Sequence, residues 1–194
     1  NLFAKYKISE NTKLNFSYDI LNYENYTNYN AFFEESIPNL PVDIFTEKES
    51  PFDIRVSKID FESLLFKRIN FSAGFKYIKS DFTNINSVNI DQEIQDEYSN
   101  QSILDEYIMA GYSQANFDLS KKIKIQAGLR YEYTDTFVLS GLGDTFVDRE
   151  YGNLFPSLFL GYKINDFNNL NLSYSKRISR PAFTDMAPML IFLD

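Results

Sequence analysis

The sequence predicts an all-β fold, an antiparallel up-and-down meander of about eight strands. Apolar and polar residues alternate over several stretches, and a period of two residues is that of a strand with one apolar face. Aromatic residues make up 17% of the 194 positions, and all of them are Phe or Tyr. This composition favours strands over helices, because a helical bundle would contain more Leu and Ala.

The N-terminal part of the chain predicts two strands followed by a long loop. Residues 2–8 form the first expected strand, and a turn at residues 9–12 leads into a second strand over residues 13–23. Apolar and polar residues alternate cleanly in the second strand and lose that pattern after Tyr23. We therefore expect a loop that reaches residue 53 and contains three prolines.

The middle of the chain predicts three more strands. They cover residues 54–66, 69–78 and 107–119, and a tight turn joins the first two. Between the second and the third lies a polar insert, residues 81–102, which is rich in Asn, Asp, Gln and Ser. We expect this insert to be the longest loop of the fold.

The C-terminal part predicts the most regular strand, residues 123–134, and a hairpin within residues 154–185. The turn of the hairpin is expected at residues 165–169, which are rich in Asn and Asp. The residues expected on one, apolar face are Ile123, Ile125, Leu129, Tyr131, Leu158, Leu160, Tyr162, Leu170, Leu172 and Tyr174. Such a two-faced strand pair suits either a soluble sheet or the wall of a membrane barrel.

The connections and the charges follow a pattern that is typical of outer-membrane barrels. Long and short connections alternate along the chain, as they do where periplasmic turns are short and outer loops are long. The net charge is −8, and the carboxylates gather in the long connections, whereas the short turns carry Lys and Arg. An acidic chain without a basic face is unsuited to nucleic acid, so we expect no nucleic-acid partner.

No group of residues predicts catalysis or a cofactor. The chain has no Cys and no His, which removes thiolate ligands and the commonest general base. Asp91, Glu93, Asp96 and Glu97 supply oxygen atoms but lack the spacing of a calcium loop. The Gly-Leu-Gly segment at residues 141–143 is expected to be a hairpin loop. We therefore expect neither an enzyme nor a bound cofactor or metal.

Two motifs in the hairpin resemble a known family. The segment L-F-P-S at residues 154–157, followed by S-Y-S-K-R-I-S-R-P at residues 173–181, resembles the outer-membrane β-barrel of TonB-dependent receptors. Residues 125–136, I-Q-A-G-L-R-Y-E-Y-T-D-T, resemble the barrel strand that precedes this hairpin. The resemblance is specific because both motifs occur in order at hairpin distance, and it is strongest from about residue 107 onward.

The resemblance implies a location in the outer membrane and a role in transport. The whole protein would have a barrel of about 22 strands with a plugged lumen. It would bind a scarce nutrient at its outer loops and import it with energy from the TonB complex, which contacts the plug. Residues 1–194 would then be a single barrel segment, a fragment without the plug domain and the remaining strands. Its expected partners are outer-membrane lipid, the TonB complex through the absent plug, and an unknown nutrient.

The polar face of the C-terminal strands is the candidate functional surface. An Arg or Lys facing lipid near the bilayer centre costs about 2–4 kcal/mol, so such residues must face the lumen of a barrel. We expect a structural polar ladder there, which fixes strand register or docks the plug. Its residues are Lys124, Gln126, Arg130, Glu132, Asn171, Ser173, Ser175 and Arg177.

Two other interpretations remain open on the sequence alone. The first is a soluble or surface-exposed β-module that binds glycan or protein. The second is a small, complete eight-stranded barrel with a structural or adhesive role. If the chain is instead a barrel segment, its first and last strands leave unpaired backbone edges, near residues 2–8 and 170–178. We expect the isolated piece to associate with itself through these edges.

Overall fold

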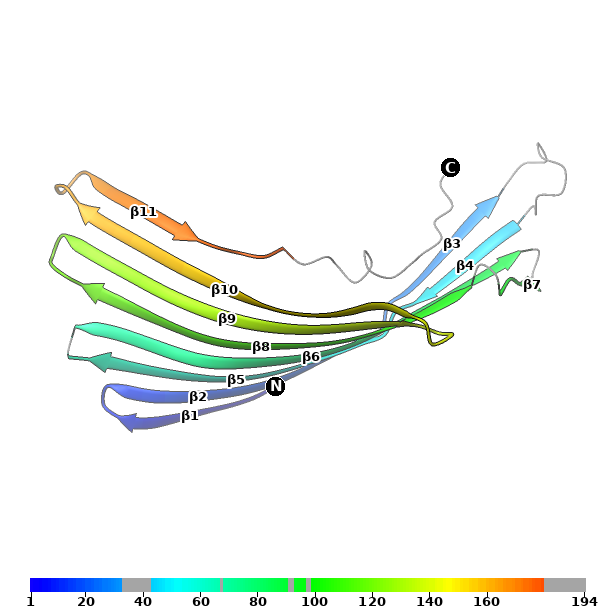
Figure 1. Ribbon diagram of the computed structural model, residues 1–194, viewed down its shortest axis with the longest axis horizontal. Helices are drawn as coiled ribbons and strands as arrows, with labels where there is room; N and C mark the ends of the chain where they lie inside the picture. The colour runs from blue at the N-terminus through cyan, green and yellow to red at the C-terminus, as the bar shows by residue number, and fades with distance from the viewer. Residues whose placement is uncertain (33–42, 67, 91–92, 97–98, 180–194) are drawn as a thin grey trace.

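A computed structural model describes residues 1–32, 43–66, 68–90, 93–96 and 99–179. Within these ranges the chain forms one antiparallel sheet of eleven strands. Eight strands follow one another in the order β1-β2-β5-β6-β8-β9-β10-β11, which confirms the expected meander (Figure 1). The strands are β1 (Leu2–Ser9), β2 (Thr12–Tyr23), β3 (Tyr26–Phe32), β4 (Asp43–Glu49), β5 (Phe52–Leu65), β6 (Ile69–Ile90), β7 (Glu93–Ile94), β8 (Asn100–Asp118), β9 (Ile123–Ser140), β10 (Thr145–Lys163) and β11 (Asn169–Ser175). No helix in the described ranges is long and apolar enough to cross a membrane.

Short turns join the strands at one end of the sheet, on the left of Figure 1. Between β8 and β9, Ser120 Oγ accepts a 3.1 Å hydrogen bond from the backbone N–H of Ile123. Between β10 and β11, Asn165 Oδ1 accepts hydrogen bonds from the N–H of Phe167, at 3.0 Å, and of Asn168, at 2.8 Å. Ser and Asn side chains of this kind replace backbone acceptors in tight turns. Both turns therefore form where the sequence predicts them.

The strand register sorts the side chains onto an apolar face and a polar face. Leu160 of β10 lies opposite Ile125 of β9 on one side and Leu172 of β11 on the other. Arg130 of β9 lies opposite Phe155 of β10. Directly opposed residues share a face and successive residues alternate, so the three apolar residues lie on one face and Arg130 lies on the other. This is the phase that the alternation in the sequence predicts for these strands.

Several strands run through segments that the sequence predicts as loops, and those predictions were wrong. Paired strands β6 and β8 occupy most of residues 81–102, where Asn84 lies opposite Ser102. The expected loop after Tyr23 contains the β3–β4 hairpin, and β10 begins at Thr145 rather than at residue 154. Polar residues occur on both faces of these segments, so the sequence lacks the alternation of apolar and polar residues by which a strand is recognised. Two of these polar residues, Asn84 and Ser102, are nevertheless buried.

The glycine segment at residues 141–143 is a hairpin loop, as expected. It joins β9 to β10, and Ser140 Oγ accepts a 2.9 Å hydrogen bond from the N–H of Asp144. Gly143 has a φ of 92°, a backbone conformation that glycine adopts without the steric cost other residues incur. The loop therefore closes a tight turn, and no helix follows it that could hold a phosphate.

Strand β4 continues the line of β5 along the edge of β6. Phe52 at the start of β5 lies opposite Phe82, and Glu49 at the end of β4 lies opposite Ile85. The break between them falls at residues 50–51, where the carbonyl of Pro51 accepts a 3.1 Å hydrogen bond from the N–H of Thr83. The β3–β4 hairpin therefore extends the sheet beyond β2 and β5 (Figure 1).

Many large apolar side chains of this sheet are exposed, whereas those of a soluble protein are mostly buried. The largest fully buried apolar side chains, Leu104, Val88 and Val138, belong to the ends of β8, β6 and β9 away from the short turns. By contrast, Leu129 is 46% exposed and Leu172 is 64% exposed on the apolar face. An apolar face of this extent requires an apolar surrounding.

The sheet is open at both sides in the part of the chain that the structure describes. Strand β1 pairs only with β2, and β11 pairs only with β10. Each of these two strands therefore presents one unpaired backbone edge, as the sequence predicts for a barrel segment.

Candidate functional site

The apolar face carries a band whose height matches a membrane. On β9 this apolar band comprises Ile123, Ile125, Ala127, Leu129, Tyr131 and Tyr133, and it continues through the residues opposed to them on β8 and β10. A tilted transmembrane β-strand needs about 9–11 residues, and residues 123–133 provide that length. Tyr133 ends the band, as aromatic residues do at the membrane interface.

A charged rim lies on the same face, just beyond the apolar band. It comprises Asp53, Arg55, Lys79, Asp81, Asp105, Asp135 and Glu150. Lys79 Nζ lies 2.9 Å from Asp81 Oδ1, and Asp81 is directly opposite Asp105. The charged rim therefore marks the level at which the apolar band of this face ends.

A hydrogen bond between Asp81 and Asp105 shifts the pKa values of the two carboxyl groups in opposite directions. The hydrogen bond with Asp81, and then burial, raise the pKa of Asp105. Burial also acts to raise the pKa of Asp81, but the hydrogen bonds with Asp105 and Lys79 outweigh it, so that the pKa of Asp81 is lowered. A proton on Asp105 therefore stabilises the ionised form of Asp81.

The opposite face carries a network of charged and polar residues, which we call the polar wall. Lys58 Nζ lies 2.7 Å from Asp60 Oδ2, and the hydroxyl of Tyr112 donates a 2.6 Å hydrogen bond to Asp60 Oδ1. The ring centroid of Tyr112 is 6.0 Å from Lys58 Nζ and 5.8 Å from Arg130 Cζ. Arg130 Nε donates a 2.9 Å hydrogen bond to Glu132, whose side chain is only 6% exposed. The polar wall thus joins β5, β8 and β9 through side chains.

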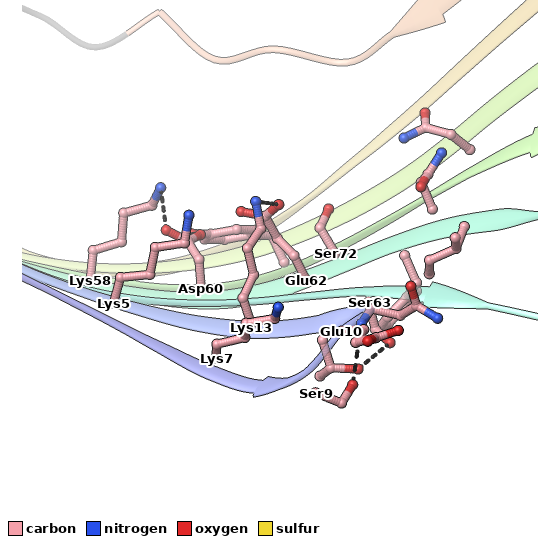
Figure 2. A pocket seen from close by; sticks show the side chains of 17 residues that line it. Lys5, Lys7, Ser9, Glu10, Lys13, Lys58, Asp60, Glu62, Ser63 and Ser72 are labelled. Carbon is pink, nitrogen blue, oxygen red and sulfur yellow. Dashed lines mark hydrogen bonds and ion pairs between the residues drawn. The ribbon is translucent and has the colours of Figure 1, made fainter. Parts of the chain in front are cut away.

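A groove of about 710 Å³ opens on the polar wall near the short turns. Figure 2 shows Lys5, Lys13, Lys58, Asp60 and Glu62 rising from their strands on the same side of the sheet. Lys13 Nζ lies 2.7 Å from Glu62 Oε2. The groove is therefore lined by charges of both signs, which suits contact with water or with another polar surface.

A second cavity, of about 410 Å³, lies farther along the polar wall. Lys58, Lys76 and Arg130 line it together with Tyr112 and Phe155. Gly128 also lines it, next to the Ser157 side chain. No carboxylate lines this cavity among the described residues, so its charged side chains are all cationic.

Most residues of the expected polar ladder lie on the polar face of β9 and β11. On β9, Lys124, Gln126, Arg130 and Glu132 occupy alternate positions of the polar face. One residue of β10 separates each ladder position of β9 from that of β11. These residues are Gly161 between Lys124 and Asn171, Phe159 between Gln126 and Ser173, and Ser157 between Gly128 and Ser175. Of the ladder residues, only Arg130 and Glu132 are joined by a hydrogen bond or ion pair among the described contacts. Arg177 follows the end of β11 and has no register.

Three residues central to the polar wall were not predicted from the sequence, namely Lys58, Asp60 and Tyr112. Asp60 and Tyr112 are 52 residues apart, and only the pairing of β5, β6 and β8 brings them together. The available signal was the alternation Tyr112, Gln114, Asn116 on β8. That strand also carries polar residues on its other face, which obscures its phase.

The acidic segment after β6 is only partly described. Glu93 and Asp96 fall in the described ranges, whereas Asp91 and Glu97 lie outside them. Within those ranges, no three carboxylates converge in a way that could hold a metal ion.

Comparison with known sequences identifies one family. The model of the "Outer membrane protein beta-barrel family" matches residues 6–194, which is nearly the whole chain. No curated protein matches the sequence.

Solved structures with a similar fold are uptake receptors. The ferric-catecholate import receptor Fiu of E. coli K12 in its open form has a TM-score of 0.65, with 12% identity over 89% of this chain and 34% of that one. The ferric citrate transporter FecA in the unliganded form has a TM-score of 0.60, with 13% identity over 84% and 24% of the two chains. The ferric yersiniabactin uptake receptor FyuA of Yersinia pestis has a TM-score of 0.59, with 16% identity over 84% and 25%. The chain thus spans between a quarter and a third of the length of these receptors.

Proposed function

The chain belongs to the outer membrane protein β-barrel family, and from this premise we propose that it forms part of the wall of a TonB-dependent receptor. Such a receptor imports a scarce nutrient across the outer membrane. The observation that supports the proposal most strongly is that the same strands have two different faces. One face carries an apolar band of membrane height, and the other carries the polar wall. The family is one of outer-membrane barrels and not of enzymes.

In this proposal the two faces have different partners. The apolar band contacts outer-membrane lipid, and the polar wall, including the ladder on β9 and β11, faces the lumen. Residues 1–194 act as a single barrel segment, and the TonB complex acts through a plug domain outside this segment. The strands that pass the charged rim carry the loops at which a nutrient binds. The open edges of β1 and β11 support self-association of the isolated segment.

The soluble-module and small-barrel interpretations are less well supported. A soluble module would expose the apolar band to water, and the family match is to membrane barrels. A complete small barrel needs its first and last strands to pair, whereas β1 and β11 are both edges.

Growth of a deletion strain tests the proposed function. The gene for the full-length protein is deleted, and growth is compared when iron chelates, cobalamin, a glycan or a peptide is the limiting nutrient. We expect a growth defect on one of these classes, equal to that of a strain without TonB, and restored by the full-length gene only when TonB is present. The proposal is contradicted if the deletion strain shows no growth defect on any of these nutrients, or if the full-length gene restores growth in the absence of TonB.

A further inference from the structure

The second cavity contains one cation, Lys76, that no carboxylate of the described residues neutralises. Lys58 Nζ lies 2.7 Å from Asp60 Oδ2, and Arg130 donates a hydrogen bond to Glu132. Lys76 makes no ion pair or hydrogen bond with the residues that the structure describes. Arg130 repels it, and so does Lys58, which lies directly opposite on β5. Like charges in this arrangement destabilise a sheet, so an anion at Lys76 would stabilise the wall.

Two aromatic rings flank another cation of the same cavity. Tyr112 on β8 and Phe155 on β10 both lie directly opposite Arg130 on β9. All three line the cavity, and the ring centroid of Tyr112 is 5.8 Å from Arg130 Cζ. The cavity therefore offers apolar ring surface beside positive charge. That combination suits a ligand that has an anionic group attached to an aromatic or apolar body.

Small residues leave room between these groups. Ala110, which lies directly opposite Lys76 on β8, presents only a methyl group. Gly128 presents no side chain between Gln114 and Ser157, the two residues directly opposite it. The Ser157 hydroxyl lies over this glycine, because a β-carbon there would come within 2.7 Å of it. The Gln114 and Ser157 side chains add neutral hydrogen-bonding groups to the lining. The volume of about 410 Å³ lies in the range of small-molecule sites.

The charge of the cavity limits the charge of its occupant. The cations that line it are Lys58, Lys76 and Arg130, and their carboxylate partners are Asp60 and Glu132. Three positive charges and two negative charges leave one positive charge. A single carboxylate neutralises it, whereas a multiply charged anion would leave an excess of negative charge. Lys and Arg form strong charge-assisted hydrogen bonds with carboxylate oxygens.

We propose that this cavity binds a small, free monocarboxylate with an aromatic or apolar body, and that Lys76 is the counter-ion of its carboxylate. The rings of Tyr112 and Phe155 contact the body of the ligand. The inference rests on the proposed function, because a solute reaches the cavity only if the polar wall borders a water-filled lumen. It adds a solute site at the height of the apolar band, since Lys76 lies on β6 between Phe75 and Tyr77.

Benzoate is a suitable probe, and the purified full-length protein in detergent is the sample. An amine-reactive reagent labels the lysines, and mass spectrometry of the digest measures the labelling of Lys76. We expect benzoate to protect Lys76 in a saturable manner, while benzamide, which has the same shape without the charge, gives no protection. Lys124 lies on the same face but lines neither cavity, so its labelling should not change when benzoate is added.

Substitutions identify the counter-ion by titration calorimetry with benzoate. Lys76→Gln removes the charge and should weaken binding by about tenfold to a hundredfold, as expected for the loss of a hydrogen bond to a charged group. Lys76→Arg keeps the charge and should restore most of the affinity. Lys124→Gln is the matched control and should bind benzoate as the parent protein does. Equal affinities of the Lys76→Gln and Lys76→Arg variants would contradict the assignment of Lys76.

Three labelling results overturn the inference. They are absence of protection by benzoate, equal protection by benzamide or by inorganic phosphate, and a Lys76 that is unreactive without any added ligand. The last result would show that another part of the protein fills the cavity. Benzoate binding is measured without TonB, whereas the growth test requires it, so the two proposals can fail separately. A TonB-dependent growth defect without benzoate binding contradicts only the inference, and binding without a growth defect contradicts only the proposed function.

Discussion

The ring of Tyr112 lies over Gly74, the residue directly opposite it on the neighbouring strand. A β-carbon on Gly74 would come within 2.5 Å of the Tyr112 side chain and 2.7 Å of the backbone oxygen of Ile59. Only glycine leaves room for the ring there. From this position the Tyr112 hydroxyl reaches across to Asp60 on β5. The missing side chain of Gly74 thus allows one tyrosine to bridge three strands.

We predict that Gly74→Ala destabilises the full-length protein by about 1–3 kcal/mol, because the added methyl group overpacks the site. The measurement is the free energy of unfolding by urea in phospholipid vesicles. Gly111→Ala is the matched control, since a β-carbon on Gly111 meets nothing within 4 Å. Equal effects of the two substitutions would show that the contact with Tyr112 is not the cause.

Two glutamates of the polar wall should differ in their contribution to stability. Glu132 is almost completely buried and accepts hydrogen bonds from Arg130, so Glu132→Gln should cost about 1.5–3 kcal/mol, as expected for hydrogen bonds to charged groups. Glu62 pairs with Lys13 where both side chains are about 40% exposed, and Glu62→Gln should cost less than about 1 kcal/mol. Urea unfolding of the two variants measures both. A larger loss for Glu62→Gln would contradict the assignment of the buried pair as the stronger one.

Arginine substitutions should distinguish the two faces of β9. Leu129 lies in the middle of the apolar band, and Leu129→Arg should cost about 2–4 kcal/mol, because it places a charge in lipid. Gln126→Arg, three residues away on the polar face, should cost much less. The amount of folded protein in isolated outer membranes, read by its heat-dependent shift in gel mobility, reports both effects. Similar losses would mean that the apolar band does not face lipid.

The stability of the charged rim should depend on pH through Asp81 and Asp105. The pKa of Asp105 is raised. Its contribution to the stability of the folded protein is therefore complete below the ordinary value of 3.8 and is lost as the pH rises through its folded-state pKa. The pKa of Asp81 is lowered, so its contribution is present above 3.8 and is lost as the pH falls through its folded-state pKa. The joint contribution to stability is therefore greatest between the two folded-state pKa values and declines as the pH rises through that of Asp105.

Asp105→Asn tests this dependence, because an amide donates a hydrogen bond to Asp81 at every pH. We expect the decline in Tm between mildly acidic and neutral pH to be smaller in this variant than in the parent protein. Thermal unfolding in detergent over that pH range provides the measurement. Asp118→Asn, at the opposite end of β8, should leave the pH dependence unchanged. A parallel shift of the whole curve in Asp105→Asn would argue against a shared proton.

The parts of this fold that alternation encodes could be predicted from the sequence. Ile125, Leu129 and Leu172 lie in strands whose apolar residues recur at every second position, so their shared face follows from the sequence. Alternation ends where both faces are polar, and this is why the strand that contains Asn84 was predicted as a loop. The contact of Tyr112 with Asp60 depends on the register of three strands, and a local pattern carries no information about register.

The break at residues 50–51 has a consequence for how this protein can diversify. The β3–β4 hairpin is connected to β2 and β5 at residues 24–25 and 50–51 and pairs with β6 through β4, while β2 and β5 keep an uninterrupted register from Thr12–Ser63 to Tyr23–Phe52. Substitutions within the hairpin therefore leave the membrane-level pairing of β2 with β5 untouched. Hairpins of different sequence can therefore occupy this place in the sheet, provided that they keep the pairing of β4 with β6.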